Sequence, residues 1–191
     1  MKINMNLPNR LTILRIVLTP VFLFMFFAKY IPYNYFISLA VFVVAAVTDF
    51  ADGKIARSRH LITNFGKIAD PIADKILTTS VFLCLMQKNL CSIWVVLIIL
   101  TREFAVSAIR ITAASQGSVI PANIYGKIKT ILQMVFSIVI LILIAVQNDL
   151  SVEFSGLEIA ASVMTWILAV VTVVSGVIYI KDSAAIIDFS K

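Results

Sequence analysis

The sequence predicts an all-α, polytopic membrane protein with six transmembrane helices, forming a single integral-membrane domain over residues 1–191. The chain has 191 residues, of which 61% are hydrophobic and 14% are charged, and its mean hydropathy is +1.02. Soluble domains carry charge on about a quarter of their residues, so this composition is typical of a protein embedded in a bilayer. No linker-like stretch or shift in composition divides the sequence, and we therefore expect one domain.

The predicted helices follow from six charge-free runs. A bilayer core about 30 Å thick needs roughly 20 apolar residues in helical conformation. Several runs are shorter, so some spans must include charged residues, and a short turn at Lys88-Asn89 separates the third helix from the fourth. No small-residue cleavage site follows the first run, so we expect a retained helix and not a signal peptide. The runs are Ile16–Ala28, Tyr30–Thr48, Ile76–Gln87, Asn89–Thr101, Thr130–Asn148 and Ile159–Ile180.

Positive charge gathers on one side of this predicted topology. The positive-inside rule then places both termini, and residues 49–74, on the cytoplasmic side of the cell (plasma) membrane. A formal net charge of +6 suits contact with anionic headgroups there. We expect no nucleic-acid partner, because no soluble domain is predicted that would bind one. The basic residues assigned to this side are Lys2, Arg10, Arg15, Lys54, Arg57, Arg59, Lys67, Lys127, Lys129, Lys181 and Lys191.

Four aspartates flank the connection between the second and third predicted helices. Asp49 and Asp52 are three residues apart and Asp70 and Asp74 are four apart, so each pair lies on one face of a helix. The two helices are antiparallel neighbours joined by a short basic connection, which allows the two carboxylate faces to meet. The pattern therefore predicts a cluster of carboxylates at the end of two membrane helices.

Such a cluster requires cations. Each aspartate near membrane depth costs about 2.5–3.5 kcal/mol, and converging carboxylates without cations repel one another and become protonated. Ligands that are all oxygen favour hard ions such as Mg²⁺ or Mn²⁺, and two such ions clamping a diphosphate would explain the number of carboxylates. The ordinary alternative is that the aspartates pair with nearby bases at the membrane rim. Those bases are Lys54, Arg57, Lys67 and Lys75.

Residues 49–74 resemble a known family. They match the pattern DxxDGxxAR, eight further residues, then GxxxDxxxD, which is similar to that of the CDP-alcohol phosphatidyltransferase family. The segments NLPNRLTILR, NFGKIADPIADKI, TREFAVSAIR and YGKIKTILQM further resemble its phosphatidylglycerophosphate synthase branch. The resemblance covers the first four predicted helices and the start of the fifth; the sixth is generic hydrophobic sequence.

The resemblance implies an activity and a set of site residues. The activity is transfer of the phosphatidyl group of CDP-diacylglycerol to glycerol 3-phosphate, with release of CMP, in anionic phospholipid synthesis. It implies that two divalent cations, Mg²⁺ or Mn²⁺, are bound by Asp49, Asp52, Asp70 and Asp74, and that Asp74 also acts as general base. It further implies a homodimer. The residues implied at the CDP-diacylglycerol end are Thr12, Arg15, Gly53, Arg57 and Thr63.

A second set of charges suggests where an anionic acceptor binds. Arg102 and Arg110 are eight residues apart, so they share a helix face about 12 Å long, and Lys127 follows them in the sequence. These three cations are predicted to form a pocket for the acceptor phosphate. The alternative is that Arg102 pairs with Glu103 or a motif aspartate while Arg110 extends to the headgroups. Glu103 itself is open to two roles, orienting the arginines or binding the acceptor's hydroxyl groups.

Other functions remain as alternatives. Within the family, a cardiolipin or inositol-phosphate type of enzyme would have the same fold and a different acceptor. A Mg²⁺ transporter is disfavoured because the acids cluster at the ends of two helices, and a scaffold without chemistry leaves the carboxylates unexplained. Cys84 and Cys91 lack metal-ligand spacing and are interpreted as packing residues, and His60 as a solvated surface residue.

Overall fold

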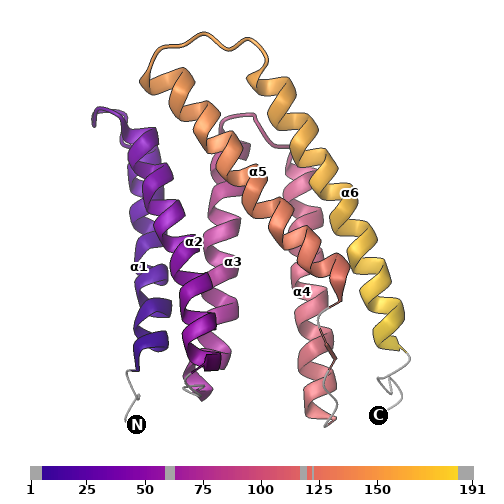
Figure 1. Cartoon of the computed structure of the whole chain (residues 1–191). Helices are drawn as coiled ribbons and strands as arrows, with labels where there is room; N and C mark the ends of the chain where they lie inside the picture. The colour runs from indigo at the N-terminus through magenta and orange to yellow at the C-terminus, as the bar shows by residue number, and fades with distance from the viewer. Residues whose placement is uncertain (1–5, 59–62, 117–119, 122, 185–191) are drawn as a thin grey trace. The chain divides into compact units, whose positions relative to one another are not determined.

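The structure is a computed structural model that describes residues 6–58, 63–116, 120–121 and 123–184; the side chains of residues 50–58, 64 and 67 are not among those described. The described ranges form six α-helices and contain no strand (Figure 1). The all-α prediction is therefore confirmed. The helices are α1 (Leu7–Phe27), α2 (Asn34–Ser58), α3 (Asn64–Gln87), α4 (Ile93–Ser115), α5 (Ile124–Asp149) and α6 (Leu157–Ala184).

Both aspartate pairs lie within helices, as predicted. α2 continues from its apolar part through Asp49 to Ser58, and α3 begins at Asn64, before Gly66, Asp70 and Asp74. The predicted turn between the third and fourth helices is present, since α3 ends at Gln87. Asn89 follows with φ of 60°, a left-handed conformation that asparagine tolerates better than most residues.

The helices have the character of membrane segments. By length and composition, α1, α5 and α6 can each cross a bilayer, and the apolar part of α2, Asn34–Asp49, is shorter. Large apolar side chains such as Trp166 and Val170 of α6 are exposed, which in a chain of this hydropathy marks contact with lipid. The chain is thus an all-α membrane protein, and the number of six spans stays a prediction.

The chain divides into two compact units, each described by itself below. The first comprises Met1–Cys84 and Ile138–Ser155, and the second comprises Leu85–Ser137 and Gly156–Lys191. In the first unit, α1 and α2 run antiparallel and side by side (Figure 1). Their buried core is aromatic: the ring centroids of Phe22 and Phe42 are 5.9 Å apart, and those of Phe26 and Tyr35 are 5.3 Å apart. This packing fixes the register of α2 along α1.

Polar contacts tie down the connection between α1 and α2. The Asn34 side-chain amide donates to the carbonyl oxygens of Met25 and Phe26, both at 3.2 Å, at the end of α1, where the last carbonyls of a helix need partners beyond the helical ladder. The backbone N–H of Phe36 donates to Asp149 Oδ2 at 2.8 Å, so a carboxylate lies at the positive N-terminus of α2. With this end fixed, the antiparallel packing brings Arg15 in the middle of α1 beside Asp49 in the second half of α2.

Candidate active site

One face of α1 is polar and buried. Asn9, Thr12, Arg15 and Thr19 recur at intervals of three or four residues and are at most 1% exposed, which places them on one face of the helix. The helix begins where it does because Asn6 caps it: the Asn6 side chain accepts a hydrogen bond from the Asn9 backbone N–H at 3.1 Å. A buried polar face must find partners, and the other helices of the first unit supply them.

Arg15 meets one of the motif aspartates. Its Nη1 lies 2.6 Å from Asp49 Oδ1, and the Arg15 side chain is fully buried while that of Asp49 is 39% exposed. A guanidinium in this position is stable only beside an opposite charge. The pair therefore orients Asp49 and leaves part of its carboxylate accessible. The resemblance implied that Arg15 lies near CDP-diacylglycerol; the contact observed is with a predicted metal ligand.

Thr12 of α1 makes the corresponding contact with an aspartate of α3. Its hydroxyl lies within hydrogen-bonding distance of Asp70 Oδ1 as well as 3.1 Å from the Pro8 carbonyl oxygen. The Asp49 and Asp70 carboxylates are close enough to interact electrostatically. Thus α1 contacts one carboxylate from each of the two motif helices, Asp49 of α2 and Asp70 of α3.

Gly66 lets the start of α3 approach α1. A methyl group at Gly66 would lie 3.3 Å from both Asn9 Oδ1 and Thr63 Oγ1, and 3.5 Å from Asp70 Oδ2. Thr63 donates to Asn9 Oδ1 at 2.8 Å and accepts from the Gly66 backbone N–H at 3.0 Å. Asn9 is therefore a site residue that the sequence reasoning did not single out, although it lies one helical turn before Thr12.

The remaining members of the predicted carboxylate set are less fully described. Asp74 lies one turn after Asp70 on α3 and is partly exposed. The side chains of Asp52, Gly53 and Arg57 lie outside the described ones. Among the described side chains, no group of three His, Cys, Asp or Glu residues lies close enough to hold a metal ion, a search that does not include Asp52.

The donor set nevertheless fits a hard divalent cation. The described ligand atoms are carboxylate oxygens, which suit Mg²⁺ or Mn²⁺. Asp70 Oδ2 lies beside Gly66, 3.5 Å from the position that a Cβ atom would take there. Two neighbouring carboxylates disfavour each other's ionisation, and a bound cation would relieve this repulsion. The predicted metal site is consistent with these contacts.

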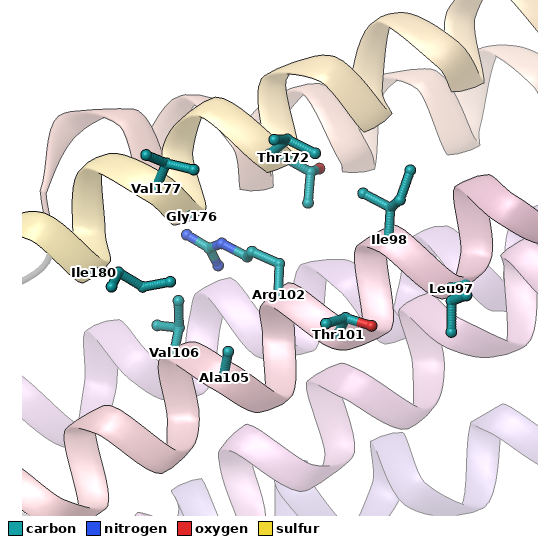
Figure 2. Close-up of a pocket in the computed structure, with 11 residues that line it drawn as sticks. Leu97, Ile98, Thr101, Arg102, Ala105, Val106, Thr172, Gly176, Val177 and Ile180 are labelled. Atoms are coloured by element: carbon teal, nitrogen blue, oxygen red, sulfur yellow. The ribbon is translucent and has the colours of Figure 1, made fainter.

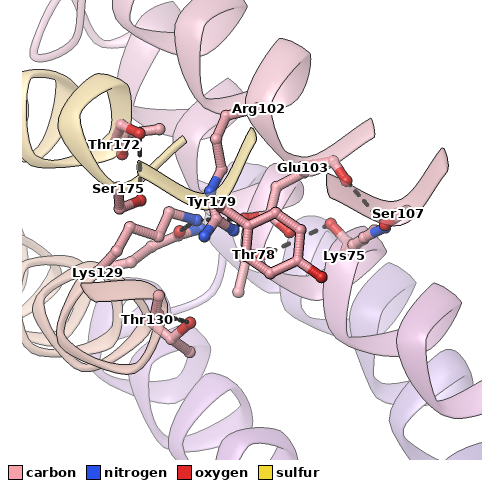
Figure 3. Close-up of polar contacts among 12 residues, drawn as sticks. Lys75, Thr78, Arg102, Glu103, Ser107, Lys129, Thr130, Thr172, Ser175 and Tyr179 are labelled. Carbon is pink, nitrogen blue, oxygen red and sulfur yellow. Dashed lines mark hydrogen bonds and ion pairs between the residues drawn. The ribbon is translucent and has the colours of Figure 1, made fainter. Parts of the chain in front are cut away.

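The second unit contains a separate group of charges, on α4 and α5. Arg102 extends from α4 beside α6 (Figure 2), and its Nη1 donates to Glu103 Oε1 at 3.1 Å. Lys129 Nζ donates to the same oxygen at 2.5 Å and also to Gln133 Oε1 (Figure 3). The Lys129 side chain is only 2% exposed. The pairing of Arg102 with Glu103, considered above as the ordinary alternative, is therefore present.

The other two predicted acceptor residues differ in their surroundings. Arg110 is exposed on α4, donates from Nε to the Tyr179 hydroxyl at 3.1 Å, and has its Cζ 5.4 Å from the centre of that ring. Tyr179 of α6 is buried, so it gives Arg110 a fixed support. Lys127 is exposed at the start of α5, and the buried lysine is Lys129, which was not among the predicted site residues. The spacing of four residues between Lys129 and Gln133, which places both on one helix face, could have indicated this contact from the sequence.

Comparison with known proteins decides the family. Residues 5–178 match the model of the CDP-alcohol phosphatidyltransferase family. The chain belongs to the CDP-alcohol phosphatidyltransferase family. It is therefore an enzyme, and the transporter and scaffold alternatives lose their support. Divalent-metal dependence is general in this family, and its membership agrees with the long apolar helices in placing the chain in a membrane.

Similar proteins carry a more specific name. The chain is 36% identical over 182 residues to the CDP-diacylglycerol–glycerol-3-phosphate 3-phosphatidyltransferase of Bacillus subtilis (strain 168), covering 90% of this chain and 91% of that one. It is 40% identical over 187 residues to the protein of the same name from Rickettsia prowazekii (strain Madrid E), covering 95% and 97%. A Pseudomonas fluorescens protein of that name is 37% identical over 145 residues, 72% of each chain.

The buried Lys129 contact yields a stability prediction. Replacing Lys129 with Met removes the closest cation from Glu103 and the hydrogen-bond donor to Oε1 of buried Gln133. Arg102 still pairs with Glu103, so the loss comes from these two hydrogen bonds, and we expect a fall of about 2 kcal/mol or more in the free energy of unfolding. The measurement is Tm of the purified protein in detergent. Lys127→Met, at an exposed position two residues earlier, is the control and should leave Tm nearly unchanged. Equal Tm values for both variants would show that the Lys129–Glu103 pair does not stabilise the fold.

Proposed function

We propose that this protein transfers the phosphatidyl group of CDP-diacylglycerol to glycerol 3-phosphate, producing phosphatidylglycerophosphate and CMP. The observation that carries the proposal is similarity over at least 90% of the chain to relatives named for that reaction. The described site residues support it chemically. The first unit offers carboxylates for divalent cations, and the second offers Arg102 and Arg110 for an anionic acceptor.

The metal ligands in this proposal are the four motif aspartates, Asp49, Asp52, Asp70 and Asp74, and the metals are two ions of Mg²⁺ or Mn²⁺. Bound there, the ions supply positive charge beside the diphosphate and raise the acidity of the acceptor hydroxyl. The chain's own contribution is to hold the ligands in place. The Arg15 contact orients Asp49, and the Thr12 hydroxyl orients Asp70.

Asp74 is proposed as the general base. It accepts the proton of the glycerol 3-phosphate hydroxyl as that oxygen bonds to the phosphorus carrying the diacylglycerol group. The bond from this phosphorus to the bridging oxygen of the diphosphate breaks, and CMP leaves with that oxygen. Ionised Asp74 is a weak base, so the step depends on close positioning of the hydroxyl as well as on its raised acidity. Its position one helical turn from Asp70 suits this role.

The donor lipid is proposed to bind near the five residues that the family resemblance assigned to it. Thr12 and Arg15 contribute by holding Asp70 and Asp49, the contacts they make here. Thr63 lies beside Gly66 at the start of α3, near the same carboxylates. Gly53 and Arg57 belong to α2 and complete the set by analogy with the motif.

We further propose that the active site faces the cytoplasm in the plasma membrane and that the enzyme is a homodimer. The excess of Lys and Arg on the predicted cytoplasmic connections supports the orientation. CDP-diacylglycerol and glycerol 3-phosphate would then both be reached from the side that carries the aspartates. Exposed apolar faces such as that of α6 provide surface compatible with a second copy.

The proposed function is tested by an acceptor panel. Purified enzyme in mixed micelles with radiolabelled CDP-diacylglycerol should form labelled product with glycerol 3-phosphate. Serine, which has no phosphate, and phosphatidylglycerol, which is a large lipid, should give little product, because the cationic side chains of the second unit suit a small phosphate-bearing acceptor. Inositol phosphate should also give little product, because the similar proteins are named for glycerol 3-phosphate. Preferred use of inositol phosphate or phosphatidylglycerol would assign the enzyme to another branch of the family and overturn the proposal.

Metal dependence gives a second test. Full activity should be lost in excess chelator and restored by Mg²⁺ or Mn²⁺. Asp49→Ala, Asp52→Ala and Asp70→Ala should each lower kcat by at least about 10³-fold, since each removes a ligand beside the reacting phosphate. Asp52→Ala and Asp70→Ala should remain folded, whereas Asp49→Ala should also lower Tm because buried Arg15 loses its contact with Asp49. Glu153→Ala, an exposed acid between α5 and α6, is the matched control and should retain activity. Near-normal turnover in any of the three aspartate variants would remove that residue from the metal site.

Arg110 provides a test of the acceptor site. If it binds the phosphate of glycerol 3-phosphate, Arg110→Gln should raise the acceptor KM about tenfold to a hundredfold, the value of one charge-assisted contact. The KM for CDP-diacylglycerol should stay unchanged, and Arg110→Lys should restore only part of the loss because lysine lacks the planar, two-pronged donor. An unchanged acceptor KM with a raised donor KM would instead assign Arg110 to the nucleotide lipid.

A further inference from the structure

Arg102 lies in an unusual environment for a charged side chain. It lines a cavity of about 330 Å³ between α4 and α6, and it is the one charged residue among those that line this cavity (Figure 2). Its side chain is only 11% exposed. A long, flexible side chain beside a cavity either exchanges between rotamers or is held in one rotamer by its neighbours. The contacts around Arg102 fix it at several points.

Two glycines from different helices contact this one arginine. A Cβ atom added at Gly176 of α6 would lie 3.1 Å from Arg102 Cγ, and one added at Gly126 of α5 would lie 3.2 Å from Arg102 Nη2. Either distance is tighter than ordinary carbon contacts, so any larger residue would push the side chain away. Glycine is a poor helix former compared with alanine. Both α6 and α5 thus have a helix-disfavouring glycine beside Arg102. Gly176 lies next to Cγ and Gly126 lies next to Nη2.

The guanidinium group is held on one side and left open on another. Nη1 donates to Glu103 Oε1, which Lys129 Nζ holds from the other side, so the acceptor of this hydrogen bond is itself fixed. Arg102 Nε is buried and has no hydrogen-bond partner among the described residues. Nε and Nη2 form the side edge of the guanidinium, the edge that binds two oxygens of one phosphate at once. A buried donor needs a hydrogen-bond partner, and a phosphate oxygen would supply one here.

We infer that Gly126 and Gly176, together with the Glu103–Lys129 pair, are positioning residues that hold Arg102 with its Nε–Nη2 edge presented to the acceptor phosphate. This inference rests on the proposed function, in which Arg102 binds the acceptor. Gly176 leaves room for Cγ of Arg102 and Gly126 leaves room for its Nη2. Glu103 holds Nη1 through its hydrogen bond. The positioning residues thus orient this edge without themselves touching the acceptor.

Close helix packing alone would also explain glycines, and the two explanations predict different results. If Gly176 and Gly126 serve packing, alanine should lower Tm and change both KM values by similar factors. If they position Arg102, alanine should leave Tm unchanged or raised, because alanine favours the helix, while acceptor binding weakens. The comparison of acceptor KM with donor KM and Tm therefore separates them.

The test uses the full-length enzyme in mixed micelles. Gly176→Ala and Gly126→Ala should each raise the glycerol 3-phosphate KM about three- to tenfold, since a phosphate anchor displaced by a fraction of an ångström loses part of its alignment. The CDP-diacylglycerol KM should not change. Val174→Ala, an exposed position on α6 two residues from Gly176, is the matched control and should have normal constants. In an Arg102→Lys background, Gly176→Ala should have little further effect, because coupled residues are not additive.

Two results would overturn the inference, and a further variant identifies which claim has failed. Unchanged acceptor KM in both glycine variants, or equal rises in both KM values with a lower Tm, would leave the glycines as packing residues only. Arg102→Gln should itself raise the acceptor KM. If Arg102→Gln raises it and the glycine variants do not, the positioning role is wrong and the acceptor site stands. If Arg102→Gln leaves it unchanged, the acceptor site itself is wrong.

Discussion

The structure depends above all on charge compensation inside apolar helices. A charge removed from water is stable only when an opposite charge or a bound ion accompanies it. In the first unit, fully buried Arg15 lies against Asp49, and the neighbouring Asp70 carboxylate takes a hydrogen bond from Thr12. In the second, buried Lys129 and Arg102 share the carboxylate of Glu103. Each ionised side chain in these two groups is accordingly held in a defined position.

The two groups differ in the sign of the charge left over. Among the described side chains around Arg15, the two carboxylates of Asp49 and Asp70 outnumber this one arginine, which suits binding of a divalent cation. Around Glu103, two cations share one acid, and Arg102 retains a buried nitrogen without a partner among the described residues, which suits binding of an anion. A phosphatidyltransferase needs both kinds of site. The same ion pairs that stabilise the helices thus leave negative charge for a cation in the first unit and positive charge for an anion in the second.

Much of this was predictable from the sequence, because charge in hydrophobic sequence is rare and its spacing is informative. The helical setting of the aspartate pairs and the break at Asn89 follow from residue spacing and from the length of the apolar runs. Contacts between helices were less accessible. Asn9 is neither charged nor a usual ligand, and only the packing of α1 against the start of α3 reveals its bond to Thr63.

The choice between two lysines shows a similar limit. Lys127 and Lys129 are close in sequence and equally basic, so composition could not tell which one is buried. The rotation of α5 decides it, and rotation depends on which residues face α4. The same holds for Gly126 and Gly176, whose relevance appears only once Arg102 is seen passing both. Sequence spacing defines faces of single helices, whereas these roles arise where faces of different helices meet.

The central claim is that the motif carboxylates presented by α1 bind divalent cations, and it is tested most directly by measuring binding without turnover. Purified protein in detergent can be titrated with Mn²⁺ while electron paramagnetic resonance follows the signal of the unbound ion. The account predicts saturable Mn²⁺ binding that Asp70→Ala weakens strongly and Glu153→Ala leaves unchanged. Equal Mn²⁺ binding by the unaltered protein and Asp70→Ala would contradict it.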